Sequence, residues 1–262
     1  MHSDKEKSEA FIRFLNVLDT LRQKCPWDAK QTNESLRANT IEEVFELTDA
    51  ILDNDPQNIK KELGDVLLHI GFYAKIADEK GQFDMADVCN ALTDKLIFRH
   101  PHIYGNVEAD SPEEVSKNWE QIKLKEKGGN KTVLSGVPKS LPSLIKANRI
   151  QEKVANVGFD WEDKSQVWDK VKEETNEVEA EIKSGNTLKL EEEFGDLMFA
   201  IINAARLYGV NPENALEKTN RKFIRRFNYL EAKAKEMGRS LKEMSLEEMD
   251  KIWDEAKSLE EE

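Results

Sequence analysis

Cysteine, glycine and proline are scarce in this chain of 262 residues, which contains 2 cysteines, 12 glycines and 7 prolines. Cys25 and Cys89 lie far apart and form neither a Cys-x-x-Cys motif nor a Cys/His pattern, which argues against a disulfide framework or a structural zinc site. We therefore expect free thiols in a reducing cytosol, and a cytoplasmic protein. The shortage of turn-forming residues argues against a sheet-rich fold and favours long helices.

Long apolar runs and an excess of basic charge are also missing. No uncharged apolar run approaches the roughly 20 residues that cross a bilayer, and the N-terminus has no apolar signal-peptide core. The chain has 39 Lys and Arg against 52 Asp and Glu, a formal net charge of −13. This balance argues against non-specific binding to nucleic acid or to an anionic membrane. We expect neither as a partner.

The chain is rich instead in acidic residues at helical spacing. Two short acidic clusters lie on what read as successive helices, joined by a turn at residues 184–186. Side chains three positions apart share a helix face, so an antiparallel pair of helices aims these carboxylates at one point. Converging carboxylates need a counter-cation, and oxygen ligands suit Mg²⁺ or Mn²⁺. The clusters consist of Glu173, Glu174, Glu177, Glu193 and Asp196.

Chance is the competing explanation, because a chain with 35% charged residues places glutamates at this spacing on solvated helix faces. Against it, the pattern occurs twice. An offset of 131 carries each upstream acidic residue and Gly64 onto its later counterpart, including the 19-residue gap from Glu43 to Glu62. A duplicated helical unit explains this better than chance. The upstream set is Glu43, Glu46, Glu62 and Asp65.

Two domains follow from the repeat. We expect an N-terminal helical domain at residues 1–127 and a C-terminal one at 143–262, joined by a linker at 128–142 that holds three glycines and two prolines. Trp119 and Lys123 match Trp253 and Lys257 near the ends of the two domains, at an offset of 134.

The two copies differ in basic residues. At four matched positions the first copy has Asn39, Asn58, Leu96 and His100, where the second has Lys170, Lys189, Lys222 and Arg226. A polyphosphate needs positive charge beyond a bridging metal. The second copy is therefore predicted to be the working site. The first is predicted to be scaffold or a weaker site, with its acidic set as a candidate second metal site.

The pattern Glu-Glu-x-x-Glu followed by Glu-x-x-Asp, duplicated on helices, resembles the MazG family of nucleoside triphosphate pyrophosphohydrolases. The likeness covers nearly the whole chain and includes the motifs at 25–28 (Cys-Pro-Trp-Asp), 158–161 (Gly-Phe-Asp-Trp) and 220–223 (Asn-Arg-Lys-Phe). It implies an all-α fold of two tandem repeats, each contributing to four-helix-bundle-like units that a homodimer completes. It also implies Mg²⁺-dependent cleavage of NTP or dNTP to NMP and pyrophosphate.

The resemblance also implies residue roles. Glu174, Glu177, Glu193 and Asp196 would hold the metal, with Glu173 counted in the catalytic set. The nucleotide would be held by Lys170, Lys189, Glu192, Lys222, Arg226 and Trp253. Glu173 and Glu192 are both candidates for the base that takes the proton from water, and nothing in the sequence selects one. Trp253 either stacks on a base or caps the helical core.

The sequence is also compatible with other functions. A carboxylate-bridged di-iron bundle expects Glu-x-x-His pairs, which the sequence lacks. A non-catalytic nucleotide sensor or partner-binding module needs the same ligands as a hydrolase, so only turnover separates the two. A pyrophosphohydrolase with one narrow substrate is the third alternative, since the sequence identifies no base-reading residue.

Overall fold

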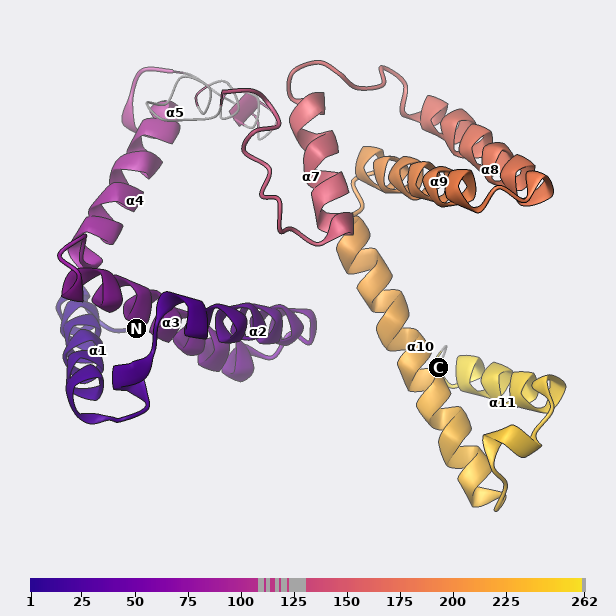
Figure 1. The fold of residues 1–262 in the computed structure, drawn as a ribbon, viewed down its shortest axis with the longest axis horizontal. Helices are drawn as coiled ribbons and strands as arrows, with labels where there is room; N and C mark the ends of the chain where they lie inside the picture. Colours follow the sequence, from indigo (N-terminus) through magenta and orange to yellow (C-terminus); the bar gives the residue numbers. More distant parts are fainter. Residues whose placement is uncertain (108–110, 112–113, 116–117, 119–121, 123–130, 261–262) are drawn as a thin grey trace. The chain divides into compact units, whose positions relative to one another are not determined.

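The computed structural model describes residues 1–107, 111, 114–115, 118, 122 and 131–260. Within these residues all regular structure is helical, as the sequence predicts, and the chain divides into two units, Met1–Glu108 and Ala109–Glu262 (Figure 1). Trp119 and Lys123, which match Trp253 and Lys257 in the sequence, fall outside the described residues, as does part of the predicted linker. None of the described helices combines the length and the hydropathy needed to cross a membrane.

The first unit consists of helices that begin at strong capping residues. Ser3 and Thr32 form capping boxes, and Asp55 caps a helix whose first residue is Pro56. Local sequence thus sets where these helices start. In chain order the elements are α1 (Asp4–Lys24), η1 (Asp28–Lys30), α2 (Asn33–Leu52), α3 (Pro56–Glu79), α4 (Met85–Arg99) and α5 (Pro101–Tyr104).

The core of the first unit lies where α1 and α2 pack on α3. A buried cluster joins Leu18, Leu36, Phe72 and Ile76. Gly71 allows the close approach, because a Cβ there would lie 2.7 Å from Phe14 Cζ and 2.9 Å from Leu18 Cδ2. The core residues of α3 lie in its C-terminal half, and its N-terminal half packs against α2.

The second unit contains an antiparallel helix pair like that of α2 and α3 in the first unit. Gly185 adopts φ 74°, which ends one helix in the left-handed conformation, and Asn186 caps the next, so the turn predicted at 184–186 is confirmed. The elements are α7 (Ser143–Ala155), η2 (Lys164–Gln166), α8 (Val167–Ser184), α9 (Thr187–Leu207), α10 (Pro212–Glu236), η3 (Leu241–Glu243) and α11 (Leu246–Ser258).

The two units carry the same antiparallel pair, α2 with α3 and α8 with α9, as the 131-residue offset predicts. Helix α7 packs on α9, and α10 pairs with α11. A hydrogen bond links α10 to α11, because Tyr229 Oη donates to Glu255 at 2.5 Å. The acidic clusters therefore lie on equivalent helix pairs.

Candidate active site

Three carboxylates converge between α8 and α9. One oxygen each from Glu174, Glu177 and Glu193 lies within 4.8 Å of the others. Glu174 is buried, Glu193 half-buried and Glu177 exposed. Loss of solvation, followed by repulsion from Glu174 and Glu193, raises the pKa of Glu177 above its usual value. Such crowding of oxygens is relieved by a cation, so the donor set fits a hard divalent metal.

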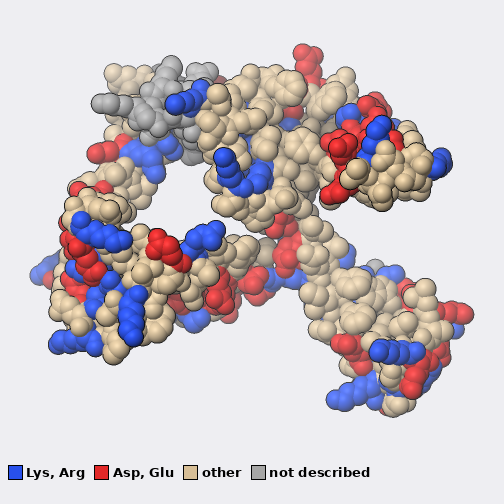
Figure 2. Space-filling view, viewed as in Figure 1, with Lys and Arg blue, Asp and Glu red and all other residues tan. Residues whose placement is uncertain are grey.

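A lysine on α8 supplies positive charge to this cluster. Lys170 Nζ lies 2.5 Å from Glu174 Oε1 and 2.9 Å from Glu173 Oε1. Hydrogen bonds to these two carboxylates raise the pKa of Lys170, so it stays protonated. Asp196 lies one turn beyond Glu193 on α9, at the edge of a neighbouring cavity. Figure 2 shows Asp and Glu side chains gathered over the α8–α9 hairpin with basic side chains among them.

The first unit has an equivalent cluster of Glu43, Glu62 and Asp65, whose oxygens also lie within 4.8 Å of one another. Glu62 is 1% exposed. Its Oε1 pairs with Lys61 Nζ at 2.8 Å, and its Oε2 has no hydrogen-bond partner among the described residues. Lys61 also lies 3.9 Å from Asp65.

Lys61 is a difference between the copies that sequence reasoning missed. The offset of 131 matches Lys61 to Glu192, so the first copy has a basic side chain where the second has an acidic one. Burial, then repulsion from Asp65, Glu46 and Glu62, raises the pKa of Glu43, while Lys61 opposes the rise. Each cluster is thus partly neutralised by a lysine of its own unit, Lys61 in the first and Lys170 in the second.

A cavity of about 710 Å³ adjoins the cluster of the second unit, lined by side chains from α7, α8, α9 and the 158–161 loop. Lys170, Glu174 and Asp196 lie on its wall, together with the aromatic side chains Phe159 and Trp161. Its size and mixed lining suit a nucleoside-sized ligand.

An ion pair positions the loop at this cavity. Arg206 on α9 forms a bidentate pair with Asp160, with N to O distances of 2.6 and 2.9 Å. Burial disfavours the charged form of Asp160, but bonds from Arg206 and from the Trp161 N–H outweigh it, so the pKa is lowered. The 158–161 motif was the sequence signal for this loop, whereas Arg206 carried none.

The remaining residues expected at the nucleotide are dispersed. Lys189 and Glu192 are exposed on α9, and Lys189 lies one turn before Glu193. Arg226 pairs with Glu260 at 2.6 Å on the α10–α11 hairpin, and Lys222 is exposed there.

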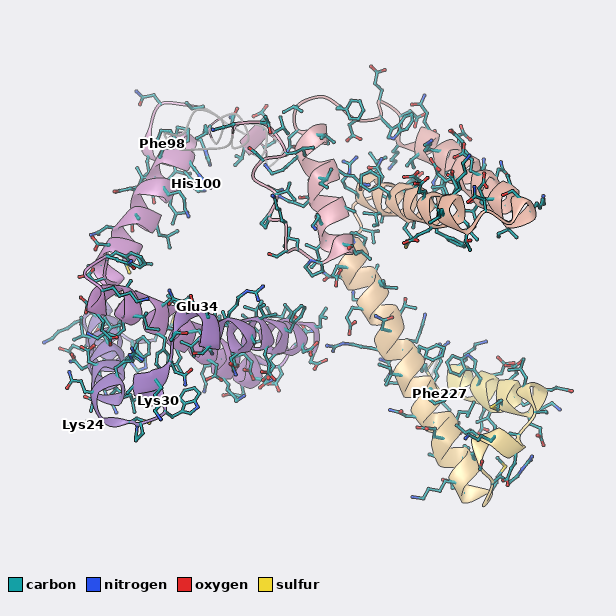
Figure 3. The ribbon with its side chains drawn as sticks, viewed as in Figure 1. Lys24, Lys30, Glu34, Phe98, His100 and Phe227 are labelled. Carbon is teal, nitrogen blue, oxygen red and sulfur yellow. The ribbon has the colours of Figure 1, made fainter. Side chains whose placement is uncertain are left out.

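Trp253, on α11, packs on an aromatic cluster of α10. Its ring lies 4.9 Å from that of Phe223, which stacks at 6.2 Å on Phe227, labelled in Figure 3. This geometry accords with a cap over the hairpin core. The contacts seen for Arg226 and Trp253 are thus with Glu260, just beyond the end of α11, and with Phe223 of α10.

A family model for the MazG nucleotide pyrophosphohydrolase domain matches residues 31–104 and 163–230, which are the two helix pairs and their flanks. The chain belongs to the MazG family. Both acidic clusters fall inside the matched segments, so each repeat carries a MazG domain.

Three known proteins resemble the chain over nearly its full length. It is 43% identical over 256 residues, 97% of this chain and 98% of the relative, to the "Nucleoside triphosphate pyrophosphohydrolase/pyrophosphatase MazG" of Thermotoga maritima. It is 42% identical over 252 residues to the "Nucleoside triphosphate pyrophosphohydrolase" of Escherichia coli K12, 94% and 96% of the two chains. An "Uncharacterized protein YabN" of Bacillus subtilis is 46% identical over 254 residues, which cover 95% of this chain and 52% of YabN.

Proposed function

We propose that this chain is a nucleoside triphosphate pyrophosphohydrolase, which cleaves NTP or dNTP at the α-phosphorus to NMP and pyrophosphate. The observation that carries the proposal is the carboxylate cluster of Glu174, Glu177 and Glu193 at the mouth of a nucleoside-sized cavity. The full-length likeness to two proteins named for this activity supports it.

Glu174, Glu177, Glu193 and Asp196 are the proposed ligands of a divalent metal, Mg²⁺ or alternatively Mn²⁺. When bound, the metal would lower the pKa of a coordinated water and neutralise charge on the phosphate oxygens. Asp196, which lines the cavity one turn beyond Glu193, is the proposed fourth oxygen ligand.

The basic residues of α8 and α9 are proposed to serve the leaving pyrophosphate. Lys170, which pairs with Glu174 here, would be available to phosphate oxygens when a bound metal balances the charge of that carboxylate. Lys189 adds charge from the start of α9, four residues before Glu193. Glu173, held by Lys170, and Glu192 remain the candidates to accept the proton from water.

A role for Lys222, Arg226 and Trp253 at the nucleotide depends on a further proposal, that the protein is a homodimer. Many large apolar side chains are exposed on α9 and α10, among them Met198 at 58% and Phe223 at 57%. Exposed apolar patches mark protein interfaces. We propose that two copies cover these faces and complete four-helix bundles, and that the α10–α11 residues reach the nucleotide in that assembly.

The first repeat is proposed to be scaffold or a weaker site. Its carboxylates resemble those of the second, but it has Asn39 and Asn58 where the second has Lys170 and Lys189. A substrate cavity at this cluster is not among the main cavities found in the described part of the chain.

Product identity tests the proposal. The purified protein is incubated with each common NTP and dNTP, with Mg²⁺, Mn²⁺ or EDTA, and the products are separated by chromatography. Metal-dependent NMP and pyrophosphate are expected. NDP and phosphate would place the attack at the γ-phosphorus and refute the proposal, and bound nucleotide without turnover would favour a sensor.

A further inference from the structure

Gln151 is a buried polar residue at the cavity that the hydrolysis scheme does not use. It lies on α7, is 3% exposed and lines the cavity beside Phe199 and Ala200. Its Nε2 donates a hydrogen bond to the main-chain oxygen of Phe199 at 2.8 Å. Because a carbonyl oxygen only accepts, the nitrogen of the carboxamide must face Phe199, which fixes the orientation of Oε1.

The Oε1 atom of Gln151 is left without a partner. Although it is buried, it accepts no hydrogen bond from any of the described residues. Buried acceptors in folded proteins are nearly always satisfied by protein, water or ligand. The contact between α7 and α9 uses Nε2 and not Oε1, so the acceptor needs a separate explanation.

The position of Gln151 relative to the carboxylates suggests which part of a nucleotide it meets. Phe199 follows Asp196 by three residues and Glu193 by six, about 4.5 and 9 Å along the helix axis at 1.5 Å per residue. In a nucleotide, the sugar and then the base extend away from the α-phosphate. With that phosphate at the carboxylates, the nucleoside reaches the level of Gln151.

Aromatic side chains on the same cavity wall suit this placement. Phe159 and Trp161 offer faces on which a base can stack, a contact that every base tolerates. Stacking alone therefore does not discriminate between nucleotides. A fixed acceptor does, because only some nucleosides present a donor at a given place.

We propose that the side-chain carbonyl of Gln151 accepts a hydrogen bond from a donor group of the substrate nucleoside, either an exocyclic amine of the base or a ribose hydroxyl. This inference rests on the proposed hydrolysis site and names a residue that sets its substrate preference.

Paired substrates and a matched pair of variants test it. Gln151→Met keeps a side chain of similar length without the acceptor, and Gln57→Met makes the same change at an exposed position of the first unit. The value of kcat/KM is measured for ATP against ITP and CTP against UTP, which differ in the exocyclic amine, and for ATP against dATP, which differ in the 2′-hydroxyl.

The wild-type chain is expected to prefer the donor-bearing nucleotide by up to about tenfold, in either the base pairs or the sugar pair. Gln151→Met should bring that ratio close to one, and Gln57→Met should leave it unchanged. The arm that responds identifies the donor.

Two results would overturn the assignment. An equal loss for all substrates in Gln151→Met would mean that Gln151 only packs α7 on α9. Wild-type ratios near one in every pair would exclude a discriminating acceptor, even if the variant failed to fold. If no NTP were turned over, the proposed function would fail separately. Titrations of the wild type with ATP and ITP, followed by tryptophan fluorescence, would then still compare a base that has the exocyclic amine with one that has an oxo group in its place.

Discussion

Glutamine in place of Glu193 removes one of the three carboxylates that converge on α8 and α9. The oxygens of Glu174 and Glu177 remain, but the neutral amide no longer contributes charge. Changing even a residue that only supports a metal ligand costs about 10 to 100-fold in metal affinity or activity. Loss of a direct ligand is therefore expected to lower turnover by at least about 100-fold, with a higher metal concentration needed for half-maximal rate.

The matched control is Glu62→Gln, which makes the same change 131 residues upstream. Glu62 is buried and paired with Lys61, whose side chain is 63% exposed and returns readily to water. Most of the turnover should persist. Pyrophosphate release at several Mn²⁺ concentrations, with thermal unfolding to check the fold, compares the two variants. Equal losses would refute the assignment of the working site to the second repeat.

Three further predictions concern the first cluster, pH and the core. Lys61→Gln should raise the number of Mn²⁺ ions bound per chain or their affinity, because the lysine no longer neutralises Glu62. Electron paramagnetic resonance measures the bound Mn²⁺. An unchanged Mn²⁺-binding isotherm would contradict the idea that Lys61 competes with the metal. The raised pKa of Glu177 means that a proton competes with metal at a higher pH than for an ordinary glutamate. Mn²⁺ affinity of the second cluster should thus fall as the pH drops through that pKa, and an affinity independent of pH from 7 down to 4 would count against the ligand role. Phe72→Ala should lower the free energy of unfolding of the first unit by about 3–5 kcal/mol, as expected for a fully buried aromatic side chain. Denaturant unfolding measures this loss. A loss below about 1 kcal/mol would mean that α1 and α2 do not pack on α3 as described.

The roles of the metal and nucleotide residues were suggested by sequence and remain predictions. The structure brings Glu174, Glu177 and Glu193 together, and places Asp196 one turn away on the cavity wall. It does not bring Trp253 to them within the second unit, where that ring packs against Phe223. The spacing in the sequence thus predicted that three of these carboxylates lie close together, whereas the nucleotide contacts stay predictions.

The helices, their ends and the repeat could be read from the chain itself. Apolar spacing, capping residues such as Ser3 and Asn186, and the positive-φ Gly185 act over a few neighbouring positions, so the order of residues determines them. The repeat needed only a constant offset of 131 between identical residues.

Three features depended on tertiary packing. Lys61 and Glu62 are adjacent in sequence, but burial of Glu62 against α2 is what makes their ion pair part of the first cluster. Gln151 faces Phe199 only because α7 packs on α9, and no local pattern marks one glutamine of an amphipathic helix as buried. The cavity exists because three helices and the Asp160 loop meet, held by Arg206 from 46 positions away. Spacing along a helix determines which side chains share a face, whereas the partners that this face meets are chosen by the packing of distant segments.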